Sequence, residues 1–266
     1  MEHLDKVHQI IFDMLCAIDD LCHRHNIQYF LDAGTLLGAV RHKDFIPWDD
    51  DADLTMRREE YEKLLKVAHE LPEPYRLITP DDYGGYFFDF IPRFINTEEL
   101  LRSPTPEDEA QLNHQNCIAV DIFLLDEAPD SSIAFRRQVL RQKMVYGNAM
   151  AHRYEKNKKK YSFVQALQVK TLRAFGRCMS LSQVLQKQEK IAQAYRGKEG
   201  KYYWQANGLV SDLHRRWERN AYVETVQLPL RDRLFDCPAG WDHILTTFYG
   251  DYMTPPKEED RRPMHL

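Results

Sequence analysis

Three aspartates at alternate positions constrain the fold of this chain more than any other feature of its sequence. Asp49, Asp51 and Asp53 lie two residues apart, ahead of the apolar residues Leu54 and Met56. If this segment is a strand, all three side chains leave the same face of a sheet. Three negative charges on one face repel each other, and a hard divalent cation with oxygen ligands removes that repulsion. The spacing therefore predicts a cation site on a sheet, with an acidic surface turn as the alternative.

Two other features favour the cation site. Gly34 and Thr35 follow a β-prone run at residues 27–31, and Asp121 lies within the apolar run 118–125. Carboxylates are rarely buried unless they are paired or bind a metal. A Gly-Ser/Thr pair, an Asp-x-Asp pair and a third Asp on a neighbouring strand resemble the pattern of the nucleotidyltransferase superfamily. In that pattern the glycine and the helix-start N–H groups bind a phosphate, and the carboxylates hold Mg²⁺ against a pyrophosphate.

Two rival motifs do not explain the acidic cluster. Residues 49–60 have the acidic spacing of an EF-hand calcium loop, but Leu54 stands where that loop requires glycine. Residues 51–55 match the Asp-x-Asp-x-Thr motif of haloacid-dehalogenase-type phosphatases, in which a strongly apolar strand comes directly before the motif. Here the turn Pro47-Trp48 precedes it instead.

The order of helices and strands that hydrophobic periodicity predicts indicates an α+β fold, and the resemblance to the nucleotidyltransferase superfamily implies a mixed sheet core flanked by helices. The expected helices cover residues 4–24, 36–40 and 58–70, the expected strands cover 27–31, 49–56, 86–95 and 118–125, and 133–196 is mainly helical. We divide the chain into a catalytic core at 1–130, a basic helical segment at 131–227 and a C-terminal element at 228–266 that packs on the core. We expect the basic segment to face the substrate that accepts a transferred group.

Charge is distributed unevenly along the chain. The net charge is -5, yet residues 136–201 contain 17 Lys and Arg against three acids. Such a segment is either a solvated helical face or a contact for an anionic surface or phosphate-rich polymer. No nucleic-acid recognition motif accompanies the charge, so nucleic acid is not an expected partner.

Composition predicts a cytoplasmic globular protein. The mean hydropathy is -0.59, and no apolar run reaches the about 18 residues that a membrane-spanning helix needs. Residues 1–6 show no basic region followed by an apolar stretch, so no secretory signal is expected. The five cysteines form no Cys-x-x-Cys pair, and neither a zinc site nor a disulfide framework is indicated.

The segment from Gly34 to Asp53, GTLLGAVRHKDFIPWDDDAD, closely resembles the signature of the LicD family. That family includes bacterial phosphorylcholine transferases and fukutin-type glycan phosphotransferases. Two further elements of the family are similar to VDIFLLD at residues 120–126 and to YGDYMTPP at 249–256, the latter followed by Arg261, Arg262 and His265. The similarity brackets nearly the whole chain except its basic middle. Ala52 and Leu124 replace the Ile and Pro that are common in the family, and both keep the strand alternation.

The resemblance implies a metal-dependent phosphotransferase that moves a phospho-alcohol, with phosphocholine favoured, from a CDP-linked donor to a glycan hydroxyl and releases CMP. The acceptor would be a teichoic-acid or lipooligosaccharide precursor, and the basic segment would contact an anionic membrane surface at the inner membrane face. Asp51, Asp53 and Asp121 are the expected catalytic residues. Together with Asp49 they are expected to hold Mg²⁺ or Mn²⁺.

The same resemblance implies where the donor lies. The expected contacts are Gly34, Thr35, Arg41, Trp48 and Arg93. A guanidinium suits bidentate contact with phosphate, which favours the two arginines as phosphate ligands. For Arg41 the alternative is an internal ion pair with a nearby aspartate, and for Arg93 it is a surface role.

Other assignments stay open at this stage. Asp121 is either a metal ligand or the base that deprotonates the acceptor hydroxyl. Trp48, Tyr86 and Phe88 either stack on cytosine, hold a quaternary ammonium through cation–π contacts, or belong to the core. His265 is an acid–base group, a phosphate ligand or a structural residue. For the whole chain, the alternatives are nucleotidyl transfer and a catalytically inactive binding subunit of the same fold; choline, ethanolamine, ribitol and glycerol are all open as the alcohol carried.

Overall fold

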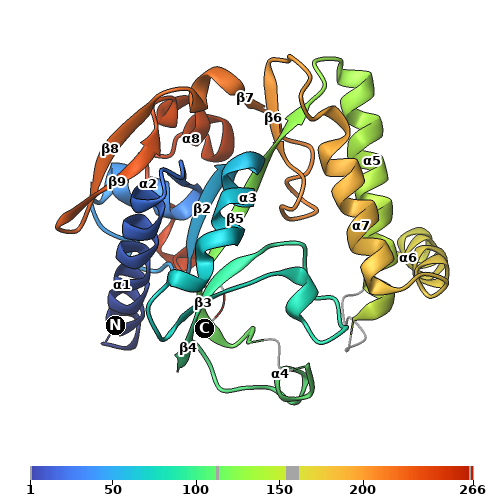
Figure 1. Ribbon diagram of the computed structural model, residues 1–266, viewed down its shortest axis with the longest axis horizontal. Helices are drawn as coiled ribbons and strands as arrows, with labels where there is room; N and C mark the ends of the chain where they lie inside the picture. Colours follow the sequence, from blue (N-terminus) through green and yellow to red (C-terminus); the bar gives the residue numbers. More distant parts are fainter. Residues whose placement is uncertain (1, 112–113, 154–161, 264, 266) are drawn as a thin grey trace.

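A computed structural model describes residues 2–111, 114–153, 162–263 and 265 of the chain (Figure 1). The α-helices are α1 (Glu2–Arg24), α2 (Ala33–Arg41), α3 (Arg58–Val67), α4 (Pro106–Gln111), α5 (Ser132–Ala149), α6 (Phe163–Gly176), α7 (Leu181–Ala192) and α8 (Trp241–Tyr249). The strands are β1 (Phe30–Leu31), β2 (Ala52–Arg57), β3 (Tyr75–Ile78), β4 (Arg93–Leu100), β5 (Cys117–Ala128), β6 (Tyr202–Gln205), β7 (Trp217–Glu218), β8 (Thr225–Leu230) and β9 (Arg233–Pro238). The predicted α+β class is confirmed.

The central element is a mixed sheet of seven strands. Its main path runs β1-β2-β5-β4-β3, and β6 pairs with β5 and with β7. Strands β2 and β5 are parallel, whereas the other neighbours in the sheet are antiparallel. β5 is the longest strand: β4 pairs with its N-terminal part and β6 with its C-terminal part. The expected strand 118–125 is therefore confirmed as the buried centre of the sheet.

Helix α1 covers one face of the sheet and packs on β5. Its residues Val7, Ile11, Met14, Ile18 and Leu21 recur at three- and four-residue spacing, and each is at most 1% exposed. This periodicity predicted the helix, because it places these side chains on one stripe that must leave water. They join the main hydrophobic core together with the apolar residues of β2 and β5.

Helices α5, α6 and α7 form a separate helical layer beside the sheet, on the right of Figure 1. A buried ion pair fixes α7 to the core: Arg58, 4% exposed, donates to both carboxylate oxygens of Asp126 on β5 at 2.9 and 2.8 Å and also to Glu189 on α7. The expected helical character of residues 133–196 is confirmed for the described part of that range. Its lysines Lys156, Lys158, Lys159 and Lys160 lie outside the described residues.

Three expectations differ from the structure. The strand expected at 49–56 begins only at Ala52, because the turn at Pro47-Trp48 continues as an irregular loop through residue 51. The strand expected at 86–95 begins at Arg93, so its aromatic first half is irregular. The boundaries expected at residues 130 and 227 also do not match the sheet. β6 and β7 lie between these positions, where β6 pairs with β5 and β7 pairs with β6.

Candidate active site

A cavity of about 720 Å³ lies beside β2 and β5. Its walls come mainly from residues 32–53, strand β5, residues 205–217 and residues 248–265. The four carboxylates expected to bind metal all line this cavity, namely Asp49, Asp51, Asp53 and Asp121. Segments far apart in sequence thus meet at the residues that the sequence singled out.

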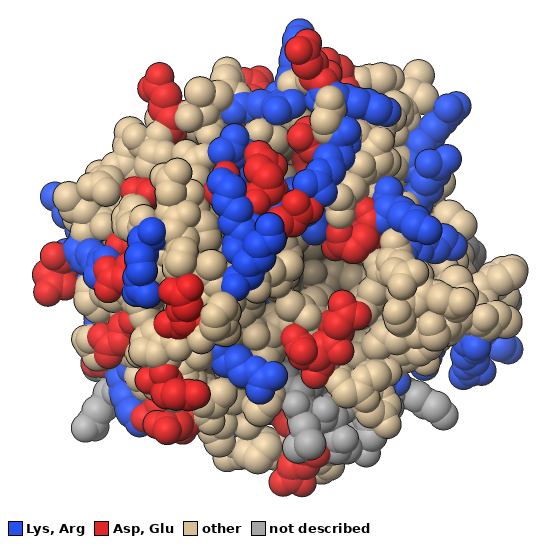
Figure 2. All heavy atoms as spheres, viewed as in Figure 1, with Lys and Arg blue, Asp and Glu red and all other residues tan. Residues whose placement is uncertain are grey.

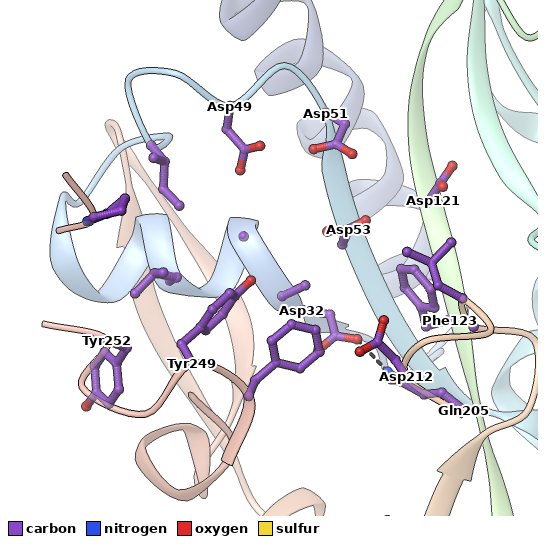
Figure 3. Close-up of a pocket in the computed structure, with 18 of the residues that line it drawn as sticks. Asp32, Asp49, Asp51, Asp53, Asp121, Phe123, Gln205, Asp212, Tyr249 and Tyr252 are labelled. Atoms are coloured by element: carbon purple, nitrogen blue, oxygen red, sulfur yellow. Dashed lines mark hydrogen bonds between the residues drawn. The ribbon is translucent and has the colours of Figure 1, made fainter. Parts of the chain in front are cut away.

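Strand register brings two of the carboxylates together. Asp53 on β2 is the register partner of Asp121 on the parallel strand β5. Asp49 and Asp51 come from the loop that leads into β2, rather than from the strand itself. Figure 3 shows their carboxylates beside those of Asp53 and Asp121, along one side of the cavity. The sequence predicted that Asp49, Asp51 and Asp53 face the same side, and all three line one cavity. A loop, rather than a strand, places the first two side chains.

Burial and mutual repulsion disfavour the ionised forms of this cluster. Burial, followed by the charge of Asp51, raises the pKa of Asp49 to about 8. Burial also raises the pKa of Asp51, and burial with the charges of Asp51 and Asp121 raises the pKa of Asp53 well above its ordinary range. A bound cation would restore the ionised carboxylates, and an all-oxygen donor set suits Mg²⁺ or Mn²⁺. The residues present therefore fit a divalent cation.

A histidine from the C-terminal segment lies next to this cluster. Asp50, 1% exposed, accepts the backbone N–H of His265 at 2.8 Å, and its Oδ1 is 3.1 Å from Nδ1 of the same residue. This hydrogen bond raises the pKa of His265 to about 9, so the imidazole is protonated at neutral pH. Nδ1 also lies 3.6 Å from a carboxylate oxygen of Asp51. Without a bound cation, His265 therefore supplies positive charge beside the carboxylates, and its ring nitrogen is also close enough to Asp50 and Asp51 for the three residues to hold a metal ion.

Gly34 and Thr35 at the start of α2 have different roles. Gly34 lines the cavity, and a Cβ built on it would collide with Oδ2 of Asp49. Thr35 is buried, does not line the cavity, and its hydroxyl accepts the backbone N–H of Asp53 at 2.8 Å. The phosphate contact expected of Thr35 is therefore not supported, because its hydroxyl ties α2 to the first residues of β2.

Arg41 and Trp48 both line the cavity, as expected of donor contacts. Arg41 donates to the backbone oxygen of Tyr252 at 2.7 Å and to Nε2 of His42 at 3.0 Å. Among the described residues it forms no ion pair with an aspartate, so the alternative considered for Arg41 is wrong. The guanidinium of Arg261 lies 5.2 Å from the ring centroid of Trp48, which adds a second positive charge at this end of the cavity.

Arg93 does not line the cavity, contrary to the expectation that it faces the donor. Its side chain is 6% exposed and donates to Asp121 at 2.8 and 3.2 Å and to Asp89 at 2.8 Å. The guanidinium thus hydrogen-bonds two carboxylates, and it fixes the orientation of the Asp121 side chain. Phe88 likewise does not line the cavity. The guanidinium groups of Arg93 and Arg153 lie 5.6 and 5.4 Å from the centroid of its ring.

Several lining residues were missed by the sequence analysis. They are Asp32, Phe123, Gln205, Asp212, Trp217, Phe248 and Tyr249. Most lie in irregular segments or at element ends, where periodicity carries no information. Phe123 and Tyr249 had a usable signal, because they lie in the two later stretches that resemble the LicD pattern.

Comparison with known proteins agrees with this site. The family model for the nucleotidyltransferase domain of LicD/FKTN/FKRP matches residues 26–92, which include Gly34 and the Asp49–Asp53 cluster. The lipopolysaccharide cholinephosphotransferase LicD of Haemophilus influenzae is 29% identical over 97% of this chain and 94% of its own length. The ribitol 5-phosphate transferase FKRP of Homo sapiens is 61% identical over 28 residues, 10% of this chain and 6% of its own. The site, the domain match and the full-length similarity together make the chain similar to the LicD proteins, with a LicD-type nucleotidyltransferase domain at residues 26–92.

Proposed function

We propose that this protein transfers phosphocholine from CDP-choline to a hydroxyl of a cell-envelope glycan and releases CMP. The observation that carries the proposal is the convergence of Asp49, Asp51, Asp53 and Asp121 on one large cavity. The full-length similarity to a lipopolysaccharide cholinephosphotransferase supports both the phospho-alcohol and the glycan. A lipooligosaccharide precursor is accordingly the first acceptor to try, and a teichoic-acid precursor the second.

The charges along the cavity suit a nucleotide-linked donor. Asp49, Asp51, Asp53 and Asp121 would hold Mg²⁺, or Mn²⁺ in its place. When bound, the cation would neutralise charge on the pyrophosphate and on the departing CMP. Arg41 lines the cavity and adds a positive charge that suits phosphate oxygens.

The transfer itself is a substitution at phosphorus. The acceptor oxygen forms a bond to the β-phosphorus of the donor, the bond from that phosphorus to the oxygen of CMP breaks, and the acceptor hydroxyl loses its proton. If Asp121 is not one of the metal ligands, it is the carboxylate that we assign to receive this proton. Arg93 donates two hydrogen bonds to Asp121 and thereby fixes the orientation of its carboxylate. Positioning of this kind is the main contribution that a protein makes to phosphoryl transfer.

The helical layer offers a surface for a membrane-attached acceptor. None of the helices in the described part of the chain is long and apolar enough to cross a membrane. On α5, however, the apolar residues Ile133 and Leu140 are 66% and 60% exposed, next to the exposed cations Arg136, Arg137 and Arg141. Figure 2 shows Lys and Arg side chains on this side of the molecule, over α5–α7. A basic surface with exposed apolar side chains suits peripheral binding to anionic lipid.

Product analysis tests the proposed reaction. CDP-choline, Mg²⁺ and each glycan precursor are incubated with the wild type, with Asp53→Asn, and with Asp13→Asn, which removes an exposed carboxylate on α1 as a control. We expect phosphocholine on the glycan and free CMP with the wild type and the control, and neither with Asp53→Asn. A cytidylyl group on the product would instead show nucleotidyl transfer. Full activity of Asp53→Asn would contradict the assigned site, and a wild type that consumes no CDP-alcohol would favour an inactive binding subunit.

A further inference from the structure

One end of the cavity has a different chemistry from the carboxylate cluster. Figure 3 shows Asp32, Phe123, Gln205 and Asp212 close together, away from Asp49. All four line the cavity, and so do the aromatic residues Trp217, Phe248 and Tyr249. This end therefore combines aromatic rings with two carboxylates that the proposed metal site does not use.

Asp32 is a buried carboxylate without a cationic partner. It is 6% exposed, it accepts a hydrogen bond from Nε2 of Gln205 at 2.5 Å, and within the described ranges no Lys, Arg or His forms an ion pair with it. Outside the carboxylate cluster of Asp49, Asp51, Asp53 and Asp121, the other aspartates buried in the fold have such partners: Asp19 pairs with Arg233, Asp50 with His265, Asp89 with Arg93, Asp108 with Arg102 and Asp126 with Arg58. Because an unpaired buried charge is costly, Asp32 is the exception that calls for a ligand of positive charge.

The second carboxylate at this end, unlike Asp32, has a cationic partner. Asp212 pairs with Arg215, whose guanidinium lies 4.4 Å from the ring centroid of Phe248. The charges of Asp212 and Arg215 therefore cancel, and the net charge at this end is that of Asp32. Because Arg215 already covers the ring of Phe248, the aromatic rings left for a ligand at this end are those of Phe123 and Trp217.

Hydrogen bonds and ring stacking hold this end rigid. Nε1 of Trp217 donates to Oε1 of Gln205 at 3.2 Å, and Gln205 in turn donates to Asp32. The rings of Trp217 and Phe248 are stacked, with centroids 6.0 Å apart and an interplanar angle of 7°. Gly208 also lines this end, and a Cβ built on it would lie 3.2 Å from the backbone oxygen of Gln205 and 3.8 Å from the ring of Phe123. A preformed pocket of this kind loses little entropy when a ligand binds.

We propose that Asp32, together with the rings of Phe123 and Trp217, binds the quaternary ammonium group of the donor, so that the protein selects choline over uncharged polyols. A trimethylammonium group has no N–H to donate, and aromatic faces with a nearby carboxylate are the chemistry that recognises it. The inference rests on the proposed function, since it assigns one end of the same cavity to the alcohol. Arg41, at the other end with Trp48, is then left for the nucleotide part.

Binding measurements with charged and uncharged ligands test the inference. Calorimetric titrations with Mg²⁺ present compare CDP-choline, CDP-glycerol and phosphocholine on the wild type, Asp32→Asn, Phe123→Leu and Glu127→Gln. Glu127 lies on β5 outside the cavity lining, and its substitution removes one negative charge as a control. We expect Asp32→Asn to weaken CDP-choline about tenfold or more, and Phe123→Leu to weaken it about fivefold, with CDP-glycerol changed less than about twofold. Glu127→Gln should leave all three affinities unchanged.

The outcomes separate this inference from the proposed function. Equal losses of CDP-choline and CDP-glycerol in Asp32→Asn would overturn the inference, as would a wild type that prefers CDP-glycerol. A fall in Mg²⁺ affinity with unchanged choline selectivity would assign Asp32 to the metal site and also overturn it. Phosphocholine that binds the wild type but not Asp32→Asn supports the inference even if no CDP-alcohol binds, and in that case the proposed function fails alone. If Asp32→Asn does not fold, Phe123→Leu decides between these outcomes.

Discussion

Replacing Asp49 by asparagine should stabilise the metal-free protein and abolish its metal response. Burial and the charge of Asp51 raise the pKa of Asp49 to about 8 from an ordinary value of 3.8. A carboxyl whose pKa is raised by folding contributes stability at acidic pH, and that stability is lost as the pH rises from about 4 to about 8. A difference of four pKa units corresponds to about 5 kcal/mol. Relaxation and water entry reduce such penalties, so we expect about 2 kcal/mol at pH 8.

Thermal unfolding in EDTA at pH 5 and at pH 8 measures this effect. For a chain of this size, about 2 kcal/mol corresponds to a rise in Tm of roughly 4–8 °C for Asp49→Asn at pH 8, with a smaller change at pH 5. Added Mg²⁺ should stabilise the wild type and have little effect on the variant.

A control with the opposite sign comes from the buried Asp126. Its carboxylate accepts two hydrogen bonds from the buried Arg58. Asp126→Asn should therefore lower the free energy of unfolding by about 3 kcal/mol at both pH values, because it weakens a buried ion pair. A wild type that is as stable in EDTA at pH 8 as at pH 5, or an Asp49→Asn protein no more stable than wild type at pH 8, would refute the reasoning.

Three further substitutions test other parts of the structure. Gly34→Ala should lower kcat at least about tenfold at an unchanged fold, because its Cβ would displace the carboxylate of Asp49; unaltered kinetics would contradict this steric account. Arg93→Gln should lower kcat about tenfold or more and leave the donor KM within about twofold, since it orients Asp121 and does not line the cavity; a selective rise in donor KM would restore its role as a phosphate ligand. Leu140→Glu should reduce flotation with anionic vesicles and leave kcat on a water-soluble acceptor unchanged; undiminished flotation would exclude the α5 surface as the membrane contact.

Much of the fold could be predicted from sequence because its long elements have clear apolar patterns. Helix α1 buries one stripe, so its apolar residues follow the helical period, and strand β5 is a nearly continuous apolar run, as is typical of a buried central strand. The hairpin of β8 and β9 and the short strands β6 and β7 were not predicted. Strands of two to six residues contain too few side chains for a period to emerge, and their pairing depends on partners far away in sequence.

The candidate site was predictable where chemistry repeats within a few residues. The spacing of Asp49, Asp51 and Asp53 identified a cluster that the structure gathers around one cavity. The environment of Arg93 was not predictable, because an arginine in an aromatic stretch can face a ligand or a carboxylate, and only the pairing of β4 with β5 decides between them. The place of Asp32 in the site was not predictable for a related reason. That it is buried and has no cationic side chain as a partner is visible only in the folded chain.

The shared register of three strands has a consequence for how the protein can be divided. Asp53, Asp121 and Arg93 form one row across β2, β5 and β4. The family match covers residues 26–92 and therefore ends one residue before Arg93, the cationic residue of this row. A fragment with those bounds would carry β2 without β5, so its acidic strand would have an unpaired edge and no partner for Asp53. The matched stretch is thus one margin of the candidate active centre. The centre is complete only when β5, contributed by a later part of the chain, lies between β2 and β4.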